Sequence, residues 1–88
     1  MSMETIIRQK LTEAFAPVLL EVKNESHLHA HHASSPGTGE SHFRVTIVSG
    51  RFAGQSRVNR HRLVNETLAA ELKGGVHALA IKASAPGE

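Results

Sequence analysis

The chain has no cysteine among its 88 residues. Without thiols it can form neither a disulfide nor a thiolate metal site from its own residues. It also has no tyrosine or tryptophan and only three phenylalanines, whereas proteins that bind single-stranded nucleic acid stack bases on such rings. No apolar run approaches the roughly 18 residues that suggest a membrane helix. These absences argue against a disulfide-rich, a base-stacking and a membrane-spanning protein.

Net charge and chain length further limit the class of protein. The net charge of +2 is small for a dedicated nucleic-acid binder, and the length predicts a single domain over residues 1–88. Residues 1–10 carry charge early and lack the apolar segment of a secretory signal, so we expect a cytoplasmic protein without membrane contact. The serine–histidine pairs lack a nucleophile elbow and a credible acid partner, so we expect no enzyme.

Histidine, in contrast, is abundant: the chain has seven, four of them at His27, His29, His31 and His32. They lie in residues 26–40, a stretch with serine, glycine and proline and no periodicity, which predicts a flexible loop of about 15 residues, longer than most connections. Imidazole is a common metal ligand that titrates near neutral pH. The spacing does not match a closed zinc site, so a solvated polar loop is the simpler interpretation from spacing alone.

Hydrophobic periodicity predicts the first helix and two strands. Residues 3–16 form an amphipathic helix with Ile7, Leu11 and Phe15 on one stripe, capped by Ser2 and stopped by Pro17. Residues 18–25 and 42–49 alternate as strands, the second of them with Phe43, Val45 and Ile47 facing inward.

The second half of the chain predicts a longer helix and a third strand. A glycine-containing turn over 50–55 leads to a helix over 57–73 that begins after Ser56 and can divide at residues 65–67, with Thr67 capping the second piece. Gly74 suits the position after the helix. A third strand follows at 76–83, and residues 84–88 form a frayed tail.

The predicted order is α-β-β-α-α-β, an α+β fold. The first two strands form an antiparallel hairpin, and a helical crossover makes the second and third strands parallel. We therefore expect a three-stranded mixed sheet with helices on one face. His42 opens the second strand and His77 lies at the start of the third, so both belong at the sheet edge where the histidine-rich loop joins the first two strands.

Residues 43–83 resemble the BolA family pattern of a strand, then F-x-G-x-S-x-V-x-R-H-R-x-V, then L-x-x-E-L and V-H-A-L-x-I. The matching residues are Phe52, Gly54, Ser56, Val58, Arg60, His61, Arg62, Val64, Leu68, Glu71, Leu72 and 76–81. The upstream segment LEVKNES and the SHF that follows the loop are also similar to the family. The resemblance implies a BolA-like fold of the class II KH type.

The resemblance further implies a monothiol glutaredoxin as partner. The glutaredoxin supplies a cysteine and a glutathione thiolate to a shared [2Fe–2S] cluster, and the BolA protein supplies the other ligands. Here these map onto His77 of the V-H-A-L motif and a loop histidine, best matched by His29, with His27, His31 and His32 as rivals. No cofactor is then expected in the isolated chain.

A second interpretation is a DNA-binding transcriptional regulator, as several BolA-type proteins are described. Arg57, Arg60 and His61 have the spacing of one helix face, with Arg62 displaced from it and Arg51 in the preceding turn. Such cations could contact phosphates, but they could equally form a solvated face or a surface that docks a glutaredoxin and its glutathione. A third interpretation is a protein-interaction module that binds no cluster.

Overall fold

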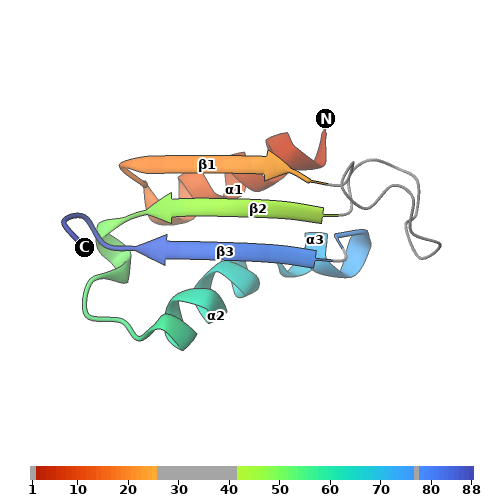
Figure 1. Cartoon of the computed structure of the whole chain (residues 1–88). Helices are drawn as coiled ribbons and strands as arrows, with labels where there is room; N and C mark the ends of the chain where they lie inside the picture. Colours follow the sequence, from red (N-terminus) through yellow and green to blue (C-terminus); the bar gives the residue numbers. More distant parts are fainter. Residues whose placement is uncertain (1, 26–41, 77) are drawn as a thin grey trace.

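The architecture is a three-stranded mixed sheet covered by helices on one face (Figure 1). A computed structural model describes residues 2–25, 42–76 and 78–88, and the loop histidines and His77 lie outside these residues. The strands are β1 (Leu19–Asn24), β2 (His42–Val48) and β3 (Ala78–Ser84), in the spatial order β1-β2-β3. β1 and β2 are antiparallel, and β2 and β3 are parallel, which confirms the predicted topology.

The helices are α1 (Met3–Phe15), α2 (Arg57–Thr67) and α3 (Ala69–Gly74), with a short 3₁₀ turn, η2 (Gly50–Phe52), after β2. The stripe predicted for the first helix is buried, and so is the inward set of β2. The core lies between helices and sheet and includes a ring contact between Phe15 and Phe52, whose centroids are 5.0 Å apart. Its buried members are Ile7, Leu11, Phe15, Val22, Phe43, Val45, Ile47, Phe52, Val64, Leu68 and Val76.

The first helix begins as predicted and ends one residue early. The Ser2 side chain accepts a hydrogen bond from the backbone N–H of Thr5. The helix ends at Phe15 because Ala16 adopts a left-handed conformation with φ 43°. The ring of Pro17 disfavours a right-handed helical conformation at the preceding residue, which explains this early end.

The strand ends also differ from the prediction. β1 lacks Val18, which is 73% exposed, and Glu25. β2 ends at Val48 because Ser49 instead caps η2, accepting from the N–H of Arg51. The described part of β3 begins at Ala78, and Val76, predicted to open the strand, instead closes the preceding helix because its N–H bonds the carbonyl of Glu71.

The predicted frayed tail over 84–88 is wrong. Ser84 belongs to β3, and its carbonyl accepts from the N–H of Ser49. Ala85 is buried, and Glu88 forms an ion pair with Arg60. The tail is therefore anchored against α2.

The long second helix divides, but Thr67 does not cap its second piece. The Thr67 hydroxyl donates back to the carbonyl of Leu63 and so belongs to α2. The joint is Leu68, which makes no side-chain capping bond and is 1% exposed. Gly74, predicted to follow the helix, is instead the last residue of α3, and Gly75 caps it with φ 156°. Burial of Leu68 continues the apolar stripe across the joint, which is why periodicity alone could not locate it.

Candidate functional site

Three chain segments meet at the sheet edge where β2 and β3 begin. His42 lies opposite Ala78 in the parallel register, and Asn24 at the end of β1 lies opposite Phe43. The N–H of Glu25 donates to the carbonyl of His42 at 2.8 Å. This edge is thus formed by the residues that flank segment 26–41 and by the residue after position 77 (Figure 1). The predicted meeting of the starts of β2 and β3 at one edge is confirmed. The place of His77 at this edge and its ligand role, with those of His29 and of the rivals His27, His31 and His32, stay predictions.

The described side chains near this edge include an ion pair. The Nε of Arg44 on β2 lies 3.2 Å from a carboxylate oxygen of Glu25. His42 is half-buried and has an interaction partner of its own. Within residues 2–25, 42–76 and 78–88, no group of three histidine, cysteine, aspartate or glutamate side chains could hold a metal ion.

The predicted basic residues lie on and before α2. The helix begins at Arg57 because the Ser56 side chain accepts from the N–H of Asn59. Arg57, Arg60 and His61 line the same groove, as their spacing predicts. Arg62 lines a second, shallow hollow that shares His61 with the groove, and Arg51 is exposed on η2. The other lining residues of the hollow are Val58, Asn65, Glu66 and Ala69. The structure thus gathers three of the five predicted residues at one groove and places two elsewhere.

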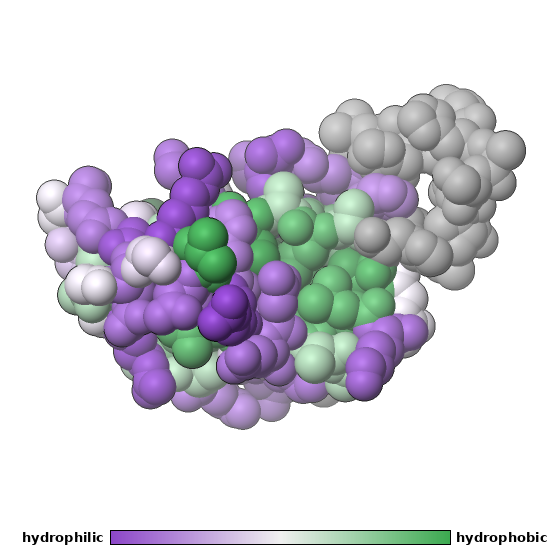
Figure 2. Space-filling model, turned by 90° about the horizontal axis from the view of Figure 1, so that it is seen from below, coloured by the Kyte–Doolittle hydropathy of each residue, from purple (hydrophilic) through white to green (hydrophobic). Residues whose placement is uncertain are grey.

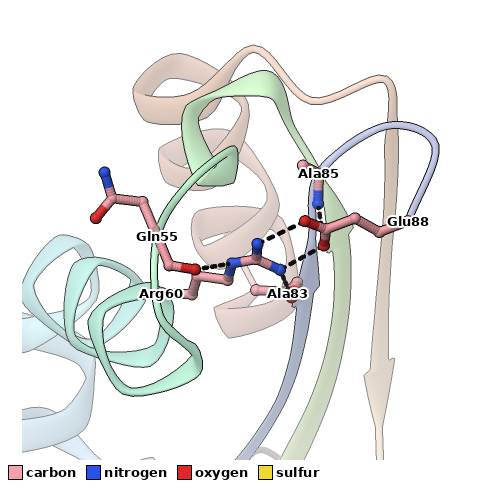
Figure 3. Close-up of polar contacts among 5 residues, drawn as sticks. All are labelled: Gln55, Arg60, Ala83, Ala85 and Glu88. Atoms are coloured by element: carbon pink, nitrogen blue, oxygen red, sulfur yellow. Dashed lines mark hydrogen bonds and ion pairs between the residues drawn. The ribbon is translucent and has the colours of Figure 1, made fainter.

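The Arg60 side chain forms an ion pair and is only 13% exposed. Its guanidinium donates to the carbonyl of Gln55 at 3.0 Å and to that of Ala83 at 3.2 Å. It also forms a two-pronged contact with the Glu88 carboxylate at 2.6 and 2.7 Å (Figure 3). The Arg60 guanidinium, which the sequence analysis assigned to phosphate contact, therefore already donates its hydrogen bonds to other residues of the chain.

The contact shifts the ionisation of both partners. The hydrogen bond from Arg60, helped by the N–H of Ala85, lowers the pKa of Glu88 to about 2. The same hydrogen bond raises the pKa of Arg60 further above its usual range. A charge-assisted pair of this geometry holds the tail of the chain against α2.

Sequence reasoning missed three charged residues of the groove: Arg44, Lys82 and Glu88. Strand alternation placed the side chain of Arg44 outward but could not show that it lines the same groove as residues of α2. Glu88 gave no signal, because its partner is 28 residues away in the sequence.

The described residues include no helix long and apolar enough to cross a membrane. The element order, the mixed sheet and the one-sided helical cover define an α+β fold of the type that the sequence predicted.

Comparison with known proteins identifies the family. The family model for BolA-like proteins matches residues 11–88, so the chain belongs to the BolA-like family. It is 54% identical over 85 residues to human BolA-like protein 1, covering 97% of this chain and 59% of the human protein. It is 53% identical over 78 residues to the DNA-binding transcriptional regulator BolA of Vibrio cholerae, covering 89% and 70%. The solved structure of BolA1 from Arabidopsis thaliana matches with a TM-score of 0.88 and 41% identity, covering 98% of this chain and 94% of that one.

Proposed function

We propose that the chain is an accessory protein that binds a monothiol glutaredoxin and co-ligates a [2Fe–2S] cluster for iron–sulfur transfer or iron-dependent regulation. Membership of the BolA-like family supports the proposal. The observation that carries it is the meeting of the starts of β2 and β3 with the end of β1 at one edge. His77 and one loop histidine, for which we take His29, are the proposed ligands.

The donor chemistry suits a shared, labile site. This chain has no cysteine, so it can offer imidazoles but no thiolates. The proposed glutaredoxin and glutathione thiolates would complete the ligand set. Replacing thiolates by neutral imidazoles makes a cluster less negative and raises its reduction potential. Protonation of an imidazole competes with iron binding, so release at lower pH is expected.

The experiment that tests the proposal is a spectral titration. A mixture of this protein with a monothiol glutaredoxin, glutathione, ferrous iron and sulfide should give a visible absorption and circular-dichroism spectrum that differs from that of the glutaredoxin homodimer. His77→Ala should abolish the difference. His61→Ala, which removes an imidazole on α2, is the matched control and should keep it. A spectrum that is unchanged in His77→Ala would refute the ligand assignment.

Single alanine substitutions at the four loop histidines identify the second ligand. We expect His29→Ala to reduce the heterocomplex spectrum most, with His27→Ala, His31→Ala and His32→Ala close to wild type. If one of these three has the largest effect instead, that histidine is the ligand. If none of the four has any effect, the loop does not ligate the cluster.

The second candidate function is DNA binding as a transcriptional regulator. The cationic side chains on α2 favour it, as does the similarity to the DNA-binding transcriptional regulator BolA of V. cholerae. Because Arg60 is bonded within the chain, exposed Arg57 and Arg62 are the better candidates for phosphate contact. Arg57→Ala should then weaken binding to promoter DNA in a gel shift and reduce its salt dependence. Absence of any shift at low salt would remove this candidate.

A further inference from the structure

β3 is an outer strand of the sheet. The strand order is β1-β2-β3, so within the described residues one side of β3 has no strand neighbour. The carbonyl of Ser84 accepts from the N–H of Ser49, so the backbone groups of Ser84 point toward the β2 side. The backbone groups of Ala83 point the opposite way, and its carbonyl accepts a hydrogen bond from the Arg60 guanidinium. By strand alternation the N–H and carbonyl of Ile81 face the same outer side, and they are therefore placed to pair with another extended chain.

A groove runs between this outer side and α2. Arg57 and His61 line it from α2, Ile81 and Ala83 from β3, and Arg44 and Lys82 from the far side of the strands. Ile81 is partly buried against the core, so the groove has an apolar element beside its charged rim. Figure 2 views the molecule from the α2 and β3 side and shows hydrophilic side chains crowded there, with hydrophobic ones between them.

The charge of the groove is strongly one-sided. Its lining includes four permanent cations, Arg44, Arg57, Arg60 and Lys82, and one carboxylate, that of Glu88. Glu88 pairs with Arg60, and Arg44 pairs with Glu25 at the opposite end. At the end of the groove formed by Arg60, the carboxylate of Glu88 from the chain's own tail thus lies in the groove. It lies next to the outward-facing carbonyl of Ala83. This contact shows which chemistry the groove accepts.

We propose that the outer side of β3 binds an extended acidic segment of a partner protein as an added strand. The backbone of the segment would pair with Ile81, and its carboxylates would lie on the sheet face that carries Lys82 and Arg44. Strand addition of this kind obtains affinity from backbone hydrogen bonds and specificity from alternate side chains. Binding of such a segment requires neither iron nor glutaredoxin, so this proposal is independent of the proposed cluster site.

Two other occupants fit less well. Single-stranded nucleic acid needs aromatic platforms, yet all three phenylalanines of the chain are at most 4% exposed and it has no tyrosine or tryptophan. A second copy pairing through its own β3 would bring two cationic rims together, and like charges across strands are destabilising. Lysine on an edge strand is itself a common guard against such self-pairing.

The test uses a fluorescein-labelled peptide of alternating valine and glutamate and the protein without iron, read by fluorescence anisotropy. We expect saturable binding to wild type that Lys82→Glu weakens by about tenfold, equivalent to loss of a favourable charge contact and gain of a repulsive one. The matched control is Lys73→Glu, which makes the same charge change at an exposed position on α3. It should leave the affinity within about twofold of wild type, as for a distant surface charge.

A second peptide separates strand addition from simple charge attraction. Methylation of alternate backbone nitrogens removes the donors on one edge of the peptide and keeps every charge, so it should abolish most of the binding. Amide hydrogen exchange at Ile81 should slow in the presence of the unmethylated peptide. Equal binding of the methylated peptide, equal loss in Lys73→Glu, absence of binding, or preference for duplex DNA would each overturn the proposal.

Discussion

Arg60 shows how a residue that looks exposed and cationic in sequence can serve the fold. Its position in a basic helix predicted phosphate contact, but its guanidinium is bonded to Gln55, Ala83 and Glu88 (Figure 3). Periodicity predicted that Arg57, Arg60 and His61 share one helix face, because helix geometry is local, and all three line one groove in the structure. It could not show the ion pair, because the partner comes from the far end of the chain.

The Arg60–Glu88 pair predicts a particular acid sensitivity. The folded-state pKa of Glu88, about 2, lies below its ordinary value of 4.5. The pair's contribution to stability is therefore fully present above about pH 4.5 and is lost as the pH falls through about 2. Glu88→Gln should be less stable than wild type near pH 6, and the difference should shrink steadily below pH 4.5 and be largely lost near pH 2, as measured by urea unfolding. A difference between the two proteins that does not depend on pH would contradict this.

Lys10 and Glu71 predict an asymmetric response to substitution. The ammonium of Lys10 on α1 lies 2.8 Å from the carboxylate of Glu71 on α3, and the Glu71 side chain is 9% exposed while that of Lys10 is 39% exposed. Lys10→Met leaves a buried carboxylate without its ionic partner, at a cost of about 1–3 kcal/mol. Glu71→Met leaves only a half-exposed ammonium and should cost less. Urea unfolding of the two variants measures both values, and the reverse order would contradict the structure.

At the scale of elements, sequence analysis predicted the three strands and the three α-helices of the described residues and the first residues of α1, β2 and α2, but it missed the other boundaries by one or two residues. The stripes of α1 and β2 follow from alternation and helical repeat, which neighbouring residues determine. The ends depend on individual hydrogen bonds that hydrophobic periodicity does not reveal. The N–H of Val76 donates to the carbonyl of Glu71 and closes α3. The Ser49 side chain accepts from the N–H of Arg51 and caps η2, so β2 ends before it. The joint at Leu68 has no capping side chain and therefore gave no sequence signal.

The segment of η2 and the turn that follows it predicts a contrast between two glycines, Gly50 and Gly54. Gly54 has φ 74°, a conformation that side chains disfavour, whereas Gly50 has no positive φ. A Cβ at either position would meet nothing within 4 Å, so only backbone conformation distinguishes them. Gly54→Ala should destabilise the protein by about 1 kcal/mol, and Gly50→Ala by clearly less. Thermal unfolding compares them, and equal losses would show that the turn does not need the glycine at position 54.

At the scale of the whole molecule, topology is what brings distant residues together. The parallel crossover sets His42 opposite Ala78, and the hairpin sets Asn24 opposite Phe43. The order of elements sufficed to predict this shared edge, because the handedness and direction of such connections are strongly constrained. The basic groove along β3 was not predicted, since it depends on how α2 packs beside an outer strand.

The central claim is that imidazoles of this chain ligate iron in a cluster shared with a glutaredoxin. The most direct measurement is pulsed electron paramagnetic resonance of the reduced complex, prepared with this protein labelled by ¹⁵N-histidine and with unlabelled glutaredoxin. We predict hyperfine coupling from two ¹⁵N nuclei, one of which disappears in His77→Ala while both persist in His61→Ala. A complex that carries the cluster but shows no ¹⁵N coupling would contradict the account.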